Sequence, residues 1–206
     1  MKVIHYRRHS IKGPDNLLTP QGIALAIDEG KKAARQITGE VTGESGPDAA
    51  FVKLRYERLF HGPLGRTLQT AMHFCHGLGY LPSPKLPIAE IGTDELFAEI
   101  ATPAFREAVK DGASNFQALL TVHGEAKAKE WAGVASEGVC KMFDGLQDGE
   151  TGIAFGHSPV IELAAWRLLG FELPEGHDRL SDLEGIIFAT DDMGKICVGP
   201  KIAVEK

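Results

Sequence analysis

Short apolar runs alternate along this 206-residue chain with longer segments whose apolar residues recur every three or four positions. The short runs predict buried strands. They lie at residues 2–6, 88–91 and 151–155, and a segment at residues 51–54 leads toward a further strand that ends at residues 59–60. These four segments predict a sheet in the interior of the molecule.

The longer segments carry helix start signals in front of apolar stripes at helical spacing. Thr19-Pro20 is one such signal, because proline is favoured at the first helical position after a capping residue. We expect helices at residues 20–37, 66–78 and 160–169, with further helix starts at Thr102-Pro103, at Ser114 and after Gly124. The segments at residues 38–47 and 81–87 are rich in Gly, Ser or Pro and are expected to connect the elements.

The end of the chain has a different pattern from the rest. Residues 185–190 and 195–198 are apolar segments separated by the turn sequence Asp191-Asp192-Met193-Gly194, which predicts an antiparallel hairpin. Strands and helices alternate before it. We therefore expect an α/β fold, in which helices flank both faces of a mostly parallel sheet with one antiparallel edge. The length and a hydrophobic content of 43% fit a single domain over residues 1–206.

Charge and cysteine content narrow the class of protein. The net charge of -6 and a pI near 5.8 argue against nucleic-acid and membrane-surface partners, which require a broad basic face. The three cysteines are far apart and odd in number, so they predict no disulfide framework, and we expect a reducing, cytoplasmic setting. No segment has the length of a signal peptide or a membrane span.

Four basic residues are placed where predicted strands give way to helices. Arg8 and His9 follow the first strand, Arg66 begins a helix, and His157 follows the strand at residues 151–155. In open α/β sheets, ligands bind beyond the carboxyl ends of the strands, where helix N-termini also point. Because a guanidinium group matches two phosphate oxygens at once, this set predicts a phosphate site.

The same residue types suit phosphoryl transfer, which depends mainly on positioning and on neutralising charge over three oxygens. An unprotonated histidine can attack phosphorus directly, and the neighbouring arginines are expected to lower its pKa toward that state. Its other ring nitrogen then needs a carbonyl partner. Neither a metal ion nor a cofactor is required.

A leaving alkoxide needs a proton, so we expect a carboxylic acid near the site, kept protonated near neutrality by the phosphate charge. The candidates are Glu90, Asp94, Glu95 and Glu99. We favour Glu90 because it ends the apolar run Leu86-Pro87-Ile88-Ala89, with Glu95 as the alternative. Asn16, in the loop after His9, is a further candidate contact for the phosphate.

The remaining histidines do not form a recognised metal-ligand motif. They are His5, His61, His73, His76, His123 and His177. Packing and surface roles are therefore expected for them, and no metal site is predicted.

Four segments resemble the histidine phosphatase superfamily, also called the phosphoglycerate-mutase-like family. Arg8-His9-Ser10 is similar to its Arg-His-Gly motif, and Leu18-Thr19-Pro20-Gln21-Gly22 to its Leu-Thr-x-x-Gly helix start. Residues 64–71 resemble its second-arginine segment, and Gly156-His157-Ser158 its second-histidine segment. Ser10 stands in place of the usual glycine, and Gly62 stands where a serine usually precedes the second arginine.

The resemblance implies a phosphoglycerate-mutase-like fold with a small helical cap insertion at about residues 92–130. His9 would be the phosphorylated nucleophile, and Arg8 and Arg66 would hold the phosphate. His157 would touch the phosphoryl group, with Ser158 beside it, and Glu90 would match the family's acid-bearing Leu-x-Glu.

The resemblance leaves three functions open. The chain lacks the Glu-Arg-His-Tyr-Gly segment typical of the mutases, so hydrolysis of a small phosphorylated substrate or of a phosphoprotein is the favoured expectation. The alternatives are a phosphate-binding regulatory protein without catalysis, and a mutase. Phosphate or sulfate is expected to occupy the site.

Overall fold

The computed structural model describes residues 1–37, 55–84 and 87–204. Its centre is a six-stranded sheet with the order β3-β2-β4-β1-β5-β6. The strands are β1 (Val3–Arg8), β2 (Tyr56–His61), β3 (Ser83–Pro84), β4 (Thr151–Gly156), β5 (Gly185–Thr190) and β6 (Ile196–Ile202). The pairs β1/β4, β2/β4 and β2/β3 are parallel, whereas β5 runs antiparallel to both β1 and β6. The expected mostly parallel sheet with a terminal hairpin is confirmed.

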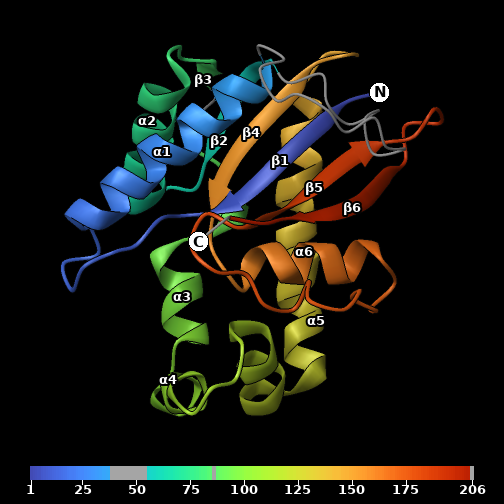
Figure 1. Ribbon diagram of the computed structural model, residues 1–206. Helices are drawn as coiled ribbons and strands as arrows, with labels where there is room; N and C mark the ends of the chain where they lie inside the picture. Colours follow the sequence, from blue (N-terminus) through green and yellow to red (C-terminus); the bar gives the residue numbers. More distant parts are fainter. Residues whose placement is uncertain (38–54, 85–86, 205–206) are drawn as a thin grey trace.

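Helices cover both faces of this sheet (Figure 1). On one face, α1 (Pro20–Ile37) and α2 (Gly65–Leu78) enclose a core with inward-facing residues of β2 and β4, such as Leu59 and Phe155. On the other face, α5 (Asn115–Asp144) and α6 (Val160–Leu168) pack on alternate residues such as Ile4 and Tyr6. Side chains of successive strand residues point to opposite faces, which is how each strand serves both cores.

Two short helices and part of α5 form a helical segment within residues 92–130, at the end of the sheet where β1 and β4 terminate (Figure 1). The helices α3 (Asp94–Ile100) and α4 (Pro103–Lys110) begin at Thr93 and Thr102, whose side chains accept hydrogen bonds from the backbone N–H groups of Leu96 and Phe105. Such caps satisfy N–H groups that have no partner within the helix.

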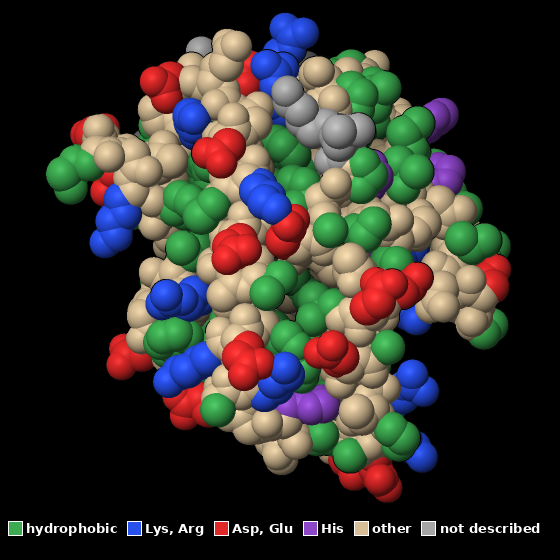
Figure 2. All heavy atoms as spheres, turned by 180° about the vertical axis from the view of Figure 1, so that it is seen from behind, with side chains coloured by type: hydrophobic (Ala, Val, Ile, Leu, Met, Phe, Trp, Pro, Cys, Tyr) green, Lys and Arg blue, Asp and Glu red, His purple; other side chains and the backbone are tan. Residues whose placement is uncertain are grey.

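The long helix α5 begins at the predicted start signal. Ser114 and Gln117 form a reciprocal capping box, and Gly124, with φ 79°, interrupts the helix where the sequence predicts a second start. Over the face seen in Figure 2, Lys and Arg side chains are interspersed with Asp and Glu side chains. Ion pairs on α5, such as Lys127 with Glu130, contribute little to stability because water surrounds them.

One predicted strand is wrong. Residues 88–91 contain a short 3₁₀ helix, Ala89–Ile91, because Ile91 and Gly92 donate backbone hydrogen bonds back to Ile88 and Ala89. The strand of this part of the chain is β3, two residues within the proline-rich run that was expected to be a connection. The connection expected at residues 38–47, the segment at 51–54 and residues 85–86 lie outside the described residues. None of the helices in the described part of the chain is long and apolar enough to cross a membrane.

Candidate active site

The register of the sheet brings the two histidines together. Arg8 is paired with Gly156 across the parallel strands β1 and β4, so the residues that follow them, His9 and His157, become neighbours. The backbone N–H of His9 donates to the Gly156 carbonyl at 2.9 Å. The two imidazole rings lie 4.9 Å apart between centroids, with 61° between their planes. They sit where carboxyl ends of adjacent strands meet, as predicted.

His9 has the ring geometry that a nucleophile requires. Its Nδ1 lies 2.6 Å from the backbone carbonyl oxygen of Ser10, so Nδ1 carries the hydrogen and Nε2 keeps a free lone pair. Burial lowers the pKa of His9 to about 3; the hydrogen bond to Ser10 opposes this, and the charges of Arg8, Arg66 and Lys12 add to it. The predicted direction of the shift is confirmed, but burial is a larger cause than the arginines.

His157 is almost completely buried, with 1% of its surface exposed. Burial, followed by the fields of His9, Arg66 and Arg8, holds its pKa well below the ordinary value. Its Nε2 has no hydrogen-bond partner among the residues that the structure describes. His157 is therefore a neutral ring with a polar atom available to a ligand.

The two arginines are close enough for their charges to act on both histidines. Arg66 is the second residue of α2 and is buried, and its guanidinium carbon lies 5.5 Å from the ring centroid of Phe97 on α3. The same Phe97 ring lies 4.5 Å from that of His157. Phe97 thus forms an apolar wall beside one histidine and one guanidinium group, which keeps water from part of the site.

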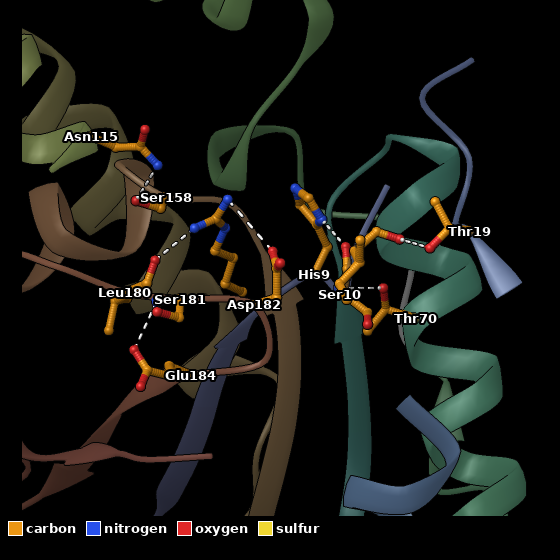
Figure 3. A network of polar contacts seen from close by, with 12 residues as sticks. His9, Ser10, Thr19, Thr70, Asn115, Ser158, Leu180, Ser181, Asp182 and Glu184 are labelled. Carbon is orange, nitrogen blue, oxygen red and sulfur yellow. Dashed lines mark hydrogen bonds and ion pairs between the residues drawn. The ribbon is translucent and has the colours of Figure 1, made fainter. Parts of the chain in front are cut away.

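Arg8 has partners that the sequence did not reveal. Its Nη1 donates to the Leu180 carbonyl oxygen at 2.6 Å, and its Nη2 lies 3.5 Å from Asp182 (Figure 3). Both partners are in the segment between α6 and β5, more than 170 positions after Arg8 in the chain. No local pattern in that segment signals this contact.

Ser10 replaces the usual glycine and is fully buried. Its hydroxyl donates to the Gly22 carbonyl oxygen at 2.7 Å, and its backbone N–H donates to the hydroxyl oxygen of Thr70 at 3.1 Å. Ser10 therefore ties the loop after His9 to α1 and α2. The serine is compatible with the site because its side chain is directed at backbone rather than at a ligand.

The structure does not place Glu90 as the sequence predicts. Glu90 lies in the 3₁₀ helix rather than at a strand end, and its carboxylate forms a hydrogen-bonded ion pair with Lys141 of α5. This pair lowers the pKa of Glu90, although some burial opposes the shift. A proton donor needs the opposite shift, so the reason for favouring Glu90 does not hold.

The other candidate acids lie on α3. Glu95 is exposed, and hydrogen bonds from its own backbone N–H and from Thr93 lower its pKa. Glu99 accepts a hydrogen bond from the indole of Trp131 at 3.2 Å. Asp94, in the first turn of α3, is the acid whose field reaches Arg66, where it opposes the lowering of that pKa by burial.

The loop after His9 adds a further cation. Burial, with the charges of Arg66, Arg106 and Arg8, lowers the pKa of Lys12. Its ammonium group donates to the side-chain oxygen of Asn16 at 2.8 Å. Asn16 is exposed and is held by Lys12, so the structure does not bring it into contact with the histidines.

No cluster of three or more His, Cys, Asp or Glu side chains suited to a metal ion occurs in residues 1–37, 55–84 and 87–204. The groups that converge at the site are two neutral imidazoles and at least two guanidinium groups. Such a site attracts a dianion and offers a nitrogen nucleophile to it.

Comparisons with known proteins agree with this geometry at the level of fold. No family model matches the chain. A search of curated proteins finds no match either.

Solved structures do match, over nearly the whole chain. A phosphoserine phosphatase from Entamoeba histolytica, solved with 3-phosphoglyceric acid, is 16% identical, with a TM-score of 0.56 and coverage of 100% of this chain and 98% of its own. A mycobacterial glucosyl-3-phosphoglycerate phosphatase bound to VO3 is 11% identical, with a TM-score of 0.59 and coverage of 99% and 100%. A phosphoglycerate mutase from Bacillus anthracis is 11% identical, with a TM-score of 0.57 and coverage of 96% and 91%. By its sheet order and its likeness to these structures over nearly the whole chain, the chain has a phosphoglycerate-mutase-like fold.

Proposed function

We propose that this protein is a metal-independent phosphatase that hydrolyses a phosphomonoester, or phosphohistidine in a protein, through a phosphohistidine on His9. The observation that carries the proposal is the state of His9: a buried, neutral ring whose Nδ1 is held by the Ser10 carbonyl, beside two guanidinium groups. The phosphatases among the structural neighbours support it.

In the first step, Nε2 of His9 attacks phosphorus, the N–P bond forms and the ester P–O bond breaks. The departing oxygen takes a proton from an acid. Arg8, Arg66 and His157 stabilise the charge on the three phosphoryl oxygens. In the second step, water attacks phosphorus and gives a proton back to the acid, the N–P bond breaks, inorganic phosphate is released and neutral His9 is regenerated.

Asp94 is the best-supported proton donor of the four candidate acids. It lies in the first turn of α3, where its field acts on Arg66, whereas the carboxylate of Glu90 is held by Lys141. A bound phosphoryl dianion would raise the pKa of a nearby carboxyl group and favour its protonated form.

Free thiols at Cys75, Cys140 and Cys197 support the proposal of a reducing, cytoplasmic setting.

The proposal is tested with an aryl phosphate as substrate and a metal chelator in the buffer. The wild-type protein is expected to turn over, and His9→Ala is expected to lose roughly a thousandfold in kcat or more. Quenching with denaturant at alkaline pH should trap a phosphoenzyme on the wild type alone, and later treatment with acid should release its phosphate. His76→Ala, an exposed histidine of α2, is the matched control.

A phosphate-binding protein without catalysis is the second candidate, and the Lys141 partner of Glu90 favours it. It predicts sulfate binding without turnover and without a trapped phosphoenzyme. A mutase would instead move phosphate between positions of a substrate without net release. Assays on a panel of phosphorylated metabolites and on phosphohistidine protein would separate these outcomes.

A further inference from the structure

A carboxyl group is buried directly behind the candidate site. Glu162 lies in the first turn of α6 and has no exposed surface. Its Oε1 lies 2.5 Å from the hydroxyl oxygen of Ser158, the residue that follows His157. In the described part of the chain, its other oxygen has no hydrogen-bond partner. A charged carboxylate in such a place would lower the stability of the fold, so burial favours the neutral acid. A buried polar atom without a partner also calls for an explanation.

Few charged groups act on this carboxyl. Arg8 and Tyr6, both on β1, are the charged or titratable side chains whose fields couple to it. The buried residues of α5 are all apolar, and those of β5 include none that titrates. Burial raises the pKa of Glu162 to about 7, although the hydrogen bond from Ser158, the nearby backbone amides and the charge of Arg8 oppose the shift. Both forms of the acid are therefore populated near neutral pH.

The Ser158 hydroxyl has a second partner from the helical segment over the site. The side-chain amide of Asn115, the first residue of α5, donates to the Ser158 oxygen at 3.0 Å. A hydroxyl group can accept two hydrogen bonds and donate one. One of the acceptor positions of Ser158 is thus already occupied.

The protonation state of Glu162 decides where the Ser158 hydrogen goes. An ionised carboxylate can only accept, so it takes the Ser158 hydrogen for itself. A protonated carboxyl can donate to the Ser158 oxygen, which then accepts from both Glu162 and Asn115. Its own hydrogen is released for a third partner.

Ser158 lies beside the histidines of the candidate site. Ser158 sits in the loop between β4 and α6, adjacent to His157, and is partly exposed. In the view of Figure 3, Ser158 and Asn115 lie across the site from His9, with Asp182 between them. A hydrogen donated from Ser158 into this space is directed toward the side of the site that carries His9.

We propose that protonated Glu162 is a positioning residue, which acts through Ser158 so that the serine hydroxyl donates a hydrogen bond to the phosphoryl group. This inference rests on the proposed function for the identity of that group. Ionisation of Glu162 withdraws the donor without moving any chain segment. The carboxyl thereby makes anion binding depend on pH through a residue that does not touch the anion.

Sulfate is a suitable probe because it stays a dianion between pH 5.5 and 8.5 and is not turned over. Its Kd would be measured by calorimetry on the full chain across this range. For the wild type, we expect binding to weaken by roughly tenfold as pH rises through about 7, which is the loss of one hydrogen bond to a charged group.

Two variants test the contribution of Glu162 and Ser158 to this pH dependence. Glu162→Gln places an amide donor at the Ser158 oxygen at every pH, so we expect binding at the low-pH level of the wild type and a flat profile. Ser158→Ala should give a flat profile at the weaker, high-pH level. The exposed Glu172→Gln is the control and should reproduce the wild-type profile.

The outcomes that test the role of Glu162 are separate from those that test catalysis. Wild-type pH dependence retained in Glu162→Gln, or in Ser158→Ala, would overturn the inference even if the protein is an active phosphatase. Flat profiles in both variants would support it even if His9→Ala showed no change in turnover. A ¹³C titration of the Glu162 carboxyl gives a readout that is independent of both variants: a midpoint near 7 is expected, and ionisation throughout the range would contradict the inference.

Discussion

Each imidazole at the site is neutral because of what surrounds it. Burial is the largest cause of the lowered pKa values of His9 and His157, and the guanidinium groups add to it. A positive cluster that also kept its histidines protonated would bind phosphate but would have no nucleophile. Arg66 supplies charge without competing for protons, because arginine stays protonated over the whole range in which histidine titrates.

Arg66→Lys tests whether the planar fork matters in addition to the charge. A lysine keeps one positive charge but cannot bind two phosphoryl oxygens in parallel, so we expect kcat/KM on an aryl phosphate to fall by roughly ten- to a hundredfold. Steady-state kinetics would measure it. Arg167→Lys is the control and should leave kcat/KM unchanged, because Arg167 lies in the last turn of α6, at the opposite end of that helix from His157. An unchanged kcat/KM in Arg66→Lys would show that charge alone suffices.

Asp94→Asn tests the proton donor. Loss of the acid should slow hydrolysis of an alkyl phosphate by roughly a hundredfold, and that of an aryl phosphate much less, because a phenolate leaves without prior protonation. Glu90→Gln is the matched control, since its carboxylate is held by Lys141. If Glu90→Gln showed the leaving-group dependence instead, the assignment would return to Glu90.

Contacts between elements determine how closely the site residues approach one another. The parallel register of β1 and β4 places His9 beside His157, and the packing of α1 on α2 supports the loop and helix start that carry Ser10 and Arg66. The two helices approach closely at Gly30 and Gly77. A Cβ atom at Gly77 would lie 1.9 Å from the carbonyl oxygen of Ile27, where only hydrogen fits.

Gly77→Ala is therefore expected to destabilise the protein, although alanine is the better helix former. Separation of α1 from α2 should lower the free energy of unfolding by about 2–3 kcal/mol, as for other overpacked cores. Urea denaturation would measure it. Gly133→Ala in α5 is the control, because nothing lies within 4 Å of the added Cβ, and it should stabilise by about 0.5–1 kcal/mol. Equal effects at the two positions would show that the close approach has no energetic consequence.

Across the whole molecule, buried titrating groups link stability to pH. Burial lowers the pKa of His5 and His9 to about 3 and holds that of His157 well below its ordinary value, so these rings take up protons near pH 6.5 only when the chain unfolds. Burial raises the pKa of Glu162 to about 7, so this carboxyl keeps its proton in the folded chain after the unfolded chain has lost it. The contribution of the three histidines to the free energy of unfolding therefore increases as pH rises toward 6.5. The contribution of Glu162 decreases as pH rises from about 4.5 to 7.

Between pH 5 and 6, the unfolded chain is expected to hold about two more protons than the folded chain. The free energy of unfolding should therefore rise by about 2–3 kcal/mol per pH unit in this range, and level off between about pH 7 and 8. Urea denaturation in buffers without phosphate or sulfate would show this, because a bound anion would itself stabilise the fold.

His5→Gln removes one of the three rings, so it should reduce the slope by about one proton, whereas the same substitution at exposed His76 should not. A free energy of unfolding that falls in the wild type as pH rises from 5 to 6 would contradict the assignment of neutral, buried histidines.

The elements of the fold were largely predictable because their signals are local. Thr19-Pro20, Thr102-Pro103 and the Ser114 capping box each begin a helix where the sequence predicts one. The segment at residues 88–91 was mispredicted because an apolar run of four residues suits a strand or a turn equally. Tertiary contacts decide between them, and here Ile91 is buried while the chain turns at Gly92.

By itself, the sequence determined the alternation of strands and helices and the placement of Arg8, His9, Arg66 and His157 at their junctions, since periodicity and capping act within a few residues of each position. Only the tertiary structure decided the state of those groups and their partners. The Leu180 contact of Arg8 spans 172 positions, Lys141 holds Glu90, and Glu162 lies buried behind Ser158. Burial and ion pairing depend on which distant segments are brought together, and a local pattern carries no information about that distance in space.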